Sequence, residues 1–423
     1  MPNKLNFTSS YAKGVISLFK GNFWAQLLGL VGTLVIAKLY GADIIGVFSK
    51  FISISAILAI FFTLRLESAF VLTNDEKNLK KIFSAIVYSI LFGTILALIF
   101  VLLLPNAWYS QINFLKVYAV FCVFGAMLKS LENAFLSYFL RYKLFAKIAF
   151  SRVLFTLVKY TVQIGLFYLL TDLGLILGFL IAAFAIVVYF YRIHGYQFSW
   201  MSLQALQSTI KENQNLVSYG VLSDNLNAIN LNLVPIFAGI YFSDAEIGWY
   251  FIAVVFLSVP VSFINTSFSK VFFLRASEIY NQDKTALFFF VKKYTYQLAL
   301  GLLLPFLAMF FLGTPFIEFV LKEQWIAVGL YIKLLAVLFY LRSIYNPLSY
   351  LEEVLKKNHL GLIFNGYLFV VNIVAILYGG FLVKDFLTTI YMIAFGLPLG
   401  YLAMVLYFLV ATNRLRRNGT NKE

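Results

Sequence analysis

Residues 34–75 read "LVIAKLYGADIIGVFSKFISISAILAIFFTLRLESAFVLTND". Two apolar runs stand on either side of the short break "YGAD", and the second run ends at "LRLE" and the polar "TND". With the apolar residues that precede it, each run reaches the ~20 residues that a helix needs to cross the hydrocarbon of a bilayer. The stretch therefore predicts a hairpin of two transmembrane helices.

The whole chain has the composition of a membrane protein. It contains 423 residues, of which 62% are hydrophobic and 12% are charged, and its mean hydropathy is +0.87. Soluble proteins carry roughly 25% charged residues. Apolar runs of ~20 residues recur along the chain and are too long for the strands of a β-barrel. We therefore expect an all-α polytopic membrane protein.

The chemistry-bearing residues are few. The single cysteine, Cys122, excludes an internal disulfide, and neither His194 nor His359 belongs to a cluster of metal ligands. We expect no metal site and no bound cofactor. No connection on the side with few basic residues exceeds about a dozen residues, which leaves no room there for a catalytic domain. These observations favour a transporter over an enzyme.

Apolar runs and polar breaks place twelve spans along the chain. They lie near residues 15–38, 44–72, 82–104, 115–139, 148–171, 174–193, 215–241, 246–274, 285–312, 325–351, 358–381 and 386–411.

The basic residues are distributed unequally between the two sets of connections. The N-terminus, the C-terminus and alternate connections, with their flanking turns, hold 22 of the 33 basic residues, and the opposite set holds 3. Under the positive-inside rule both termini are cytoplasmic. The net charge of +15 is then explained by anionic lipid at the cytoplasmic leaflet, without a nucleic-acid partner.

Two sequence matches indicate an internal repeat. "YGADIIGVF" (40–48) matches "FSDAEIGWY" (242–250) at an offset of 202, and "KSLENAF" (129–135) matches "RSIYNPL" (342–348) at an offset of 213. The order and the spans correspond, which predicts two six-helix lobes, residues 1–205 and 206–423. Copies with an even number of spans share one orientation and are related by an axis along the membrane normal.

One span is unusually polar. Residues 223–232 read "SDNLNAINLN". At 100° per residue Ser223, Asn227 and Asn230 share a stripe with Asp224 beside it, whereas Asn225 and Asn232 lie on the opposite face. We expect the first face to contact water and substrate and the second to contact protein; the alternative is that all six join helices. At the 202 offset Asp224 overlays Asn22, so Asn22 and Gln26 form a weaker polar patch on the first span.

Cations occur inside several spans. Lys129 and Arg342 occupy equivalent places in the two repeats, which suits an anionic substrate such as a phosphate or pyrophosphate. Lys159 in the fifth span and Arg65, which precedes Glu67 in the second, are further candidates for binding the substrate in the same cationic cavity. The alternative for each is a buried ion pair, and Lys129 with Glu132 has the i,i+3 spacing for one. Glu132 or Asp224 offers a possible site for a coupling H⁺ or Na⁺.

The hairpin of residues 34–75, with "LYG-AD-IG-F" followed by "LRLESAF", and the twelve-span layout resemble the multidrug/oligosaccharidyl-lipid/polysaccharide (MOP) exporter superfamily. Within it the chain resembles Wzx-type flippases of O-antigen and capsule units. The resemblance implies a MATE-like inverted V of two lobes in the bacterial inner membrane. It also implies a cationic cavity, lined by Arg65, Lys129 and Arg342, that moves an undecaprenyl-pyrophosphate-linked oligosaccharide from the inner to the outer leaflet by alternating access.

The resemblance leaves other functions open. A MATE-type cation-coupled multidrug antiporter is expected to carry acids in its N-terminal lobe, where this chain has Glu67 and Glu132, both beside cations. Lipid II flippases of the superfamily usually have two further spans. A membrane polysaccharide polymerase or ligase is expected to have a large outer loop with Arg and His. For the flippase we expect a monomer whose partners are the lipid-linked oligosaccharide, membrane lipids and a polysaccharide polymerase with its assembly proteins.

Overall fold

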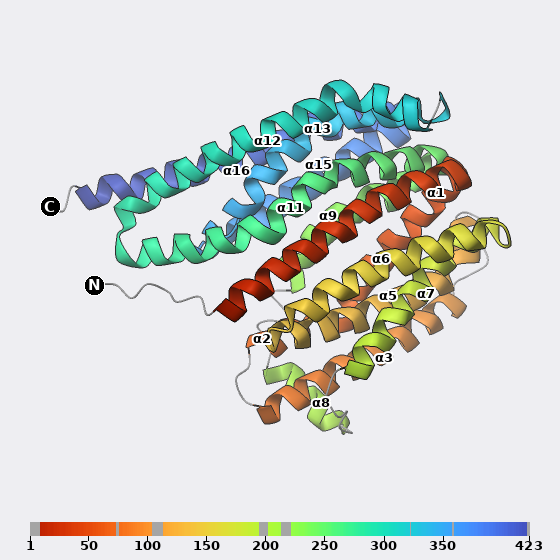
Figure 1. Cartoon of the computed structure of the whole chain (residues 1–423), viewed down its shortest axis with the longest axis horizontal. Coiled ribbons are helices and arrows are strands. Elements are labelled where there is room, and N and C mark those ends of the chain that lie inside the picture. Colours follow the sequence, from red (N-terminus) through yellow and green to blue (C-terminus); the bar gives the residue numbers. More distant parts are fainter. Residues whose placement is uncertain are drawn as a thin grey trace. The chain divides into compact units, whose positions relative to one another are not determined.

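A computed structural model of the chain describes residues 9–72, 76–103, 113–193, 202–212, 221–321, 323–357 and 359–420. These residues form helices and short turns, and no strand occurs among them (Figure 1). Contacts divide the chain into two compact units, Met1–Ile236 and Phe237–Glu423. The first unit extends beyond residue 205 because α9 (Val221–Leu233) packs against α1 (Ser9–Thr63). The lobe boundary at 205/206 remains a prediction about the repeat.

The helices of each unit follow the order of the expected spans. In the first unit α1 and α9 are joined by α2 (Leu66–Leu72), α3 (Glu76–Leu103), α5 (Asn113–Arg141), α6 (Phe145–Phe167), α7 (Thr171–Ile193) and α8 (Leu203–Glu212). A π-helical turn (Val234–Ala238) and α10 (Gly239–Tyr241) follow α9. The second unit contains α11 (Asp244–Gln282), α12 (Lys284–Leu321), a 3-10 turn (Glu323–Trp325), α13 (Ile326–Leu348), α14 (Leu351–Val354), α15 (His359–Leu377), a π-helical segment (Tyr378–Val383) and α16 (Phe386–Thr420).

Each of the twelve expected spans falls mainly on helical segments, and residues 104, 215–220 and 358 of these spans lie outside the described residues. Nine segments there are long and apolar enough to cross a membrane, and one of them, Phe19–Thr63, has the length of two spans. A shorter apolar segment is Leu226–Tyr241. The helix α6 has 23 residues but is more polar, because it carries Lys147, Arg152 and Lys159. The all-α polytopic fold expected from the sequence is confirmed.

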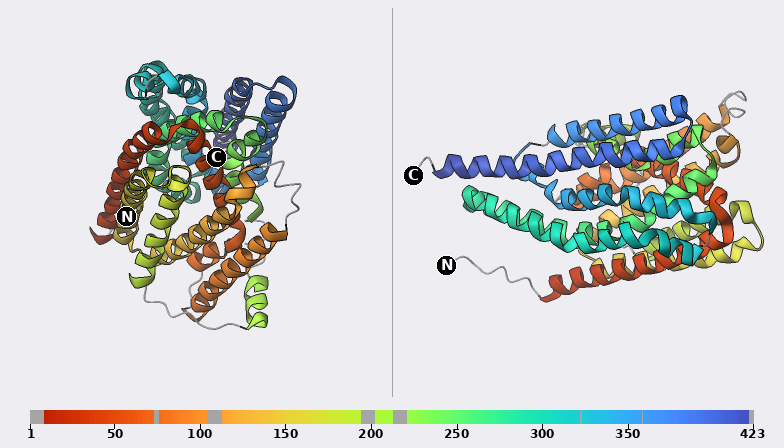
Figure 2. Two further views of the ribbon diagram at one scale, coloured as in Figure 1. Left: turned by 90° about the vertical axis from the view of Figure 1, so that its right-hand side faces the viewer. Right: turned by 90° about the horizontal axis from the view of Figure 1, so that it is seen from above.

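Gly41 separates the first two spans. Its backbone has φ 78° and ψ 173° inside α1, at the break "YGAD". This region of backbone conformation is open to glycine and costly for other residues. Figure 2 (right) shows the chain turning sharply at the end of the long N-terminal helix. The predicted hairpin therefore depends on one glycine.

A Gly41→Ala variant is expected to lose about 1–3 kcal/mol of stability through backbone strain. A Cβ atom at Gly41 would meet nothing within 4 Å, so the loss would come from conformation alone. Gly29→Ala is the matched control, because Gly29 is also open but lies within the helical part of α1, where alanine is favoured by up to about 1 kcal/mol. Thermal unfolding in one detergent measures both; equal midpoints for the two variants would contradict the role of Gly41.

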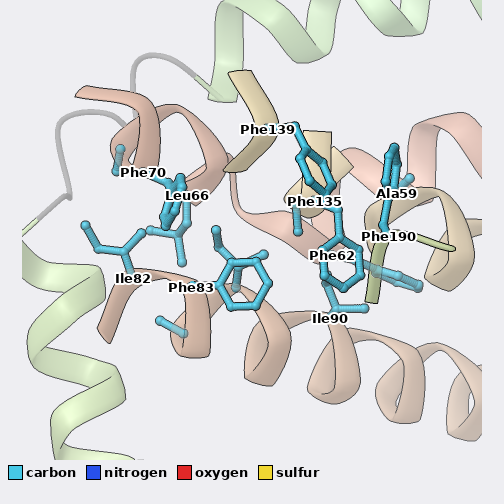
Figure 3. Packing of buried hydrophobic residues seen from close by; sticks show 14 of the residues in the cluster. Ala59, Phe62, Leu66, Phe70, Ile82, Phe83, Ile90, Phe135, Phe139 and Phe190 are labelled. Carbon is cyan, nitrogen blue, oxygen red and sulfur yellow. The ribbon is translucent and has the colours of Figure 1, made fainter. Parts of the chain in front are cut away.

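Aromatic side chains fill the core of the first unit. Phe70 of α2 contacts Phe83 of α3 with ring centroids 6.0 Å apart, Phe83 contacts Phe135 of α5 at 5.8 Å, and Phe135 contacts Phe190 of α7 at 6.0 Å. Figure 3 shows these rings together with Phe62 of α1. Leu206 and Ile210 of α8 pack against the same cluster, so α8 is attached to this unit through α3.

In the second unit α13 is the central helix and packs against α11, α12 and α16. Close approach of α12 and α13 depends on small residues. A Cβ atom at Gly313 would lie 2.8 Å from Ile332, and one at Gly329 would lie 2.6 Å from the Thr314 backbone. The helix α12 is accordingly longer than the span expected at 285–312, because it continues through Pro315 to Leu321.

Two turns whose residue numbers differ by 213, the offset of the second sequence match, have the same backbone hydrogen bonds. At the end of α5, Lys143 N–H donates to Leu140 and Leu144 N–H donates to Phe139; after α14, Lys356 N–H donates to Glu353 and Lys357 N–H donates to Glu352. Both sets form the Schellman pattern that ends a helix. Its left-handed residue is lysine in each case, Lys143 with φ 56° and Lys356 with φ 55°. The two units thus repeat a turn as well as a sequence.

Candidate functional site

The first candidate group lies on α5. The Lys129 ammonium donates to Glu132 with an Nζ–Oε2 distance of 2.9 Å, across one helical turn. The Lys129 side chain is 41% exposed and that of Glu132 is 15% exposed. The ion pair left open by the sequence is therefore formed, but it leaves much of the lysine accessible.

A second cation joins Glu132 from the neighbouring helix α6. The Arg152 Nη1 donates to Asn22 Oδ1 of α1 over 2.6 Å, and Arg152 also interacts electrostatically with Glu132. Asn22 is only 3% exposed. We call Asn22, Lys129, Glu132 and Arg152 the α1–α5–α6 cluster. Its two cations and one carboxylate leave it with a positive charge.

The polar stripe of α6 explains how the cluster is placed. Arg152, Thr156, Lys159 and Gln163 follow the i, i+4, i+7, i+11 spacing of one helix face. Further along the same helix Tyr160 shares a hydrogen bond of 2.8 Å with Thr33 of α1, and Gln163 Nε2 donates to the Leu175 carbonyl of α7 over 2.8 Å. These contacts fix the rotation of α6 between α1 and α7.

Lys159 belongs to the same polar face of α6. Its ammonium lies 4.0 Å from the centre of the Tyr160 ring and 5.9 Å from that of Phe155. Contacts of this kind stabilise a cation without neutralising it.

Arg65 lies in the turn between α1 and α2, inside the second span expected at 44–72. Leu64 and Arg65 have positive φ and separate α1 from α2. The Arg65 N–H donates to Thr63 Oγ1 over 3.3 Å, and the Thr63 hydroxyl lies 3.1 Å from Glu67 Oε1. Arg65 also interacts electrostatically with Glu67. The segment "TLRLE" is thus a sharp turn whose two charged residues are coupled.

In the second unit Arg342 has a different environment from its counterpart Lys129. Its guanidinium lies 5.6 Å from the Phe339 ring centre and interacts electrostatically with Tyr250 and Tyr401. At the position equivalent to Glu132 stands Tyr345, whose hydroxyl donates to Glu352 over 3.0 Å. Within the residues that the structure describes, no carboxylate lies within ion-pair distance of Arg342.

The serines that follow these cations, Ser130 and Ser343, are equivalent in structure as well. Both are fully buried, and their hydroxyls donate to the carbonyls four residues earlier, of Ala126 and Phe339, over 2.7 Å. The matched serines therefore belong to the packing, whereas the cations before them remain partly accessible.

The polar stretch of residues 223–232 is described only in part. Its backbone forms α9, but the side chains of Ser223, Asp224 and Asn225 lie outside the described part of the structure. Asn227 is exposed, Asn230 is buried, and Asn232 Nδ2 donates to the Ala228 carbonyl over 2.8 Å. On α1, Gln26 is partly buried and has an interaction of its own.

Of the residues expected from the sequence, the structure brings together Asn22, Lys129 and Glu132. Arg152 was not expected as a site residue. From the sequence it is one of the 22 basic residues that flank the expected cytoplasmic connections. The seven-residue spacing to Lys159 was the available signal, because it places both cations on one face of α6. In the described residues no group of three or more His, Cys, Asp or Glu side chains is placed to hold a metal ion.

Solved structures share this fold. The chain matches the lipid II flippase MurJ in an inward closed conformation with a TM-score of 0.72 and 15% identity, over 95% of this chain and 90% of that one. It matches an inward-facing multidrug resistance MATE transporter with a TM-score of 0.59 and 11% identity, over 95% of each chain. A MOP superfamily transporter from Pyrococcus furiosus matches with a TM-score of 0.53 and 14% identity, over 96% and 97%.

The chain therefore shares the fold of these MurJ and MATE structures. The chain belongs to the polysaccharide biosynthesis protein family, whose model matches residues 35–329, more than half of its length. None of the curated proteins compared with the chain matches it.

Proposed function

We propose that this protein is a flippase that moves an undecaprenyl-pyrophosphate-linked oligosaccharide, the repeat unit of an O-antigen, capsule or exopolysaccharide, from the inner to the outer leaflet. It acts by alternating access in the bacterial inner membrane, with both termini in the cytoplasm, and it catalyses no covalent step. The family match and the transporter fold support a lipid-linked substrate.

The observation that carries this proposal is an excess of cations over carboxylates within the spans. The α1–α5–α6 cluster keeps a net positive charge, Lys159 rests on an aromatic ring, and Arg342 has no carboxylate partner in the described residues. A charged side chain at the centre of a membrane costs about 2.5–3.5 kcal/mol on insertion scales, so such residues are retained for a function. Phosphate groups are the complementary ligand.

The same observation weighs against a cation antiporter. The carboxylate of Glu132 already contacts Lys129 and interacts with Arg152, and that of Glu67 interacts with Arg65. A cationic drug would have to compete with these resident cations. A coupling H⁺ or Na⁺, if the cycle uses one, would act through Glu132 or Asp224.

The chain is expected to restore surface polysaccharide when it is expressed in a host that lacks its own repeat-unit flippase but makes the matching repeat unit. The measurement is the length distribution of the polymer on a gel, with the expression level checked by blot. An empty vector and a Gly41→Ala variant serve as controls. Failure to restore polymer at normal expression, in hosts that supply several different repeat units, would contradict the proposal.

A further inference from the structure

Arg152 combines three features that set it apart from the other cations of the spans. Its residue keeps exposed surface although it lies in the expected fifth span, its Nη1 donates to a buried amide, and the Glu132 carboxylate interacts with it electrostatically. In the described residues Asn22 is the hydrogen-bond partner of this guanidinium. A guanidinium carries five N–H donors, so among the described residues the bond to Asn22 uses one of them.

The partner of Arg152 orients the guanidinium without neutralising it. Asn22 is 3% exposed and therefore fixed by the packing of α1, and its amide oxygen accepts over only 2.6 Å. A carboxylate in the place of the Asn22 amide would neutralise the charge of Arg152 and so weaken its attraction for an anionic ligand. An amide leaves the positive charge of the guanidinium in place. It also fixes the orientation of the guanidinium plane, whose paired N–H donors bind phosphate.

Arg152 and Glu132 lie at similar distances from the turn that joins their helices, and Lys129 contacts Glu132 from one helical turn further along α5. With a rise of 1.5 Å per residue, Glu132 is about 13 Å from the end of α5 and Arg152 is about 10 Å from the start of α6. The turn that joins the two helices spans only residues 142–144. A guanidinium at this depth is costly in lipid, so we expect it to face water or polar protein groups.

We infer that Arg152 is an anion-binding residue for the phosphates of a pyrophosphate head group, with Asn22 as its positioning residue and Lys129 as its partner cation. Glu132 is then a resident anion that the phosphates displace, because it interacts with both cations. This inference rests on the proposed function and adds to it the residues of the head-group site in the first unit.

The test measures direct binding by the purified full chain in nanodiscs. Farnesyl pyrophosphate is the probe for a prenyl pyrophosphate, inorganic pyrophosphate is the probe for the free anion, and nanodiscs with and without phosphatidylglycerol report competition from ordinary anionic lipid. Arg152→Gln is expected to weaken binding of farnesyl pyrophosphate by about ten-fold or more, whereas Arg152→Lys retains part of the affinity. The matched control is Lys147→Gln, which removes one positive charge from the same helix outside the cluster.

Glu132→Gln is expected to change the affinity for pyrophosphate in the opposite direction. Removing the competing carboxylate is expected to tighten pyrophosphate binding several-fold, whereas a merely structural role of the cluster would make this variant bind more weakly. Asn22→Ala is expected to weaken binding, and to add little in the Arg152→Gln background, because a positioning residue acts only through the side chain that it positions. Thermal unfolding without ligand identifies variants that bind weakly because they are misfolded.

Two outcomes overturn the inference. One is an Arg152→Gln protein that is folded and binds farnesyl pyrophosphate as tightly as the parent. The other is equal competition by phosphatidylglycerol, which would assign the site to bulk lipid. Both leave the complementation result untouched. Conversely, a parent that binds pyrophosphate through Arg152 but restores no polymer would refute the proposed function and keep the inference.

Discussion

Transport by an Arg342→Ala variant is expected to fall about ten-fold or more, because a charge-assisted contact to phosphate contributes about 1.5–3 kcal/mol and 1.4 kcal/mol corresponds to a factor of ten. Arg342 has no carboxylate partner among the described residues, so its charge remains available for a ligand. Arg342→Lys is expected to keep part of the activity and to lose the bidentate geometry. The readout is the amount of surface polymer at equal expression.

Lys333→Ala is the matched control for Arg342→Ala. Lys333 lies on the same helix α13, and its ammonium is 5.4 Å from the Phe310 ring centre. We expect it to extend toward the head groups at the outer end of the span, where loss of its charge has little effect. Full activity of Arg342→Ala at normal expression would exclude a role in binding substrate.

Lys129 is distinguished from Arg342 by a double variant. If Lys129 only neutralises Glu132, then Lys129→Ala combined with Glu132→Ala should restore the activity lost in Lys129→Ala, because no buried carboxylate is left without its partner. If Lys129 binds phosphate, the double variant stays impaired relative to Glu132→Ala alone. The Lys129–Glu132 distance of 2.9 Å makes this comparison informative, because the pair is formed in the structure.

A Gly178→Val variant is expected to be strongly destabilised. A Cβ atom at Gly178 of α7 would lie 2.4 Å from Gln163 Cγ and 3.0 Å from the Gln163 backbone nitrogen of α6. Gln163 is fully buried and holds the Leu175 carbonyl, so it has no room to move. Overpacking of this kind costs about 1–3 kcal/mol, and valine adds two methyl groups to the clash.

The same change on the facing helix is the control. Gly165 of α6 would have nothing within 4 Å of an added Cβ, so Gly165→Val should fold almost normally. Thermal unfolding followed by size-exclusion chromatography measures both variants. Because Gly178 sets the distance between α7 and α6, Gly178→Val should also displace Arg152 and Lys159 and lower transport more than the stability loss alone explains. Similar midpoints for the two variants would show that this close contact is not needed.

The layout of the fold could be predicted from the sequence because the bilayer imposes it. Apolar length gives each span, and "YGAD" marks the first turn, where Gly41 alone adopts a conformation closed to other residues. The extent of α12 could not be predicted, since Gly313 and Pro315 usually interrupt helices. In this chain Gly313 allows close packing against Ile332, and that contact is visible only when α13 is in place.

Candidate residues that occupy equivalent places in the two sequence repeats could be predicted, whereas those placed by the rotation of a helix could not. Lys129 and Arg342 follow from the matched strings "KSLEN" and "RSIYN". Arg152 was hidden because a cation seven residues into α6 contributes equally to a count of cytoplasmic charge. Its role depends on the amide of Asn22, 130 residues earlier, and no local pattern connects the two.

The paired turns at Lys143 and Lys356 have a consequence for the assembly of the protein in the membrane. Each lysine holds a left-handed backbone, which costs roughly 1 kcal/mol or more and which glycine would adopt without that cost. In the proposed orientation both turns face the cytoplasm. Lysine there costs folding stability and supplies a positive charge at the tip of a nascent helical hairpin, where it resists translocation. Glycine at either position should therefore give a more stable protein, a larger fraction of which inserts upside down.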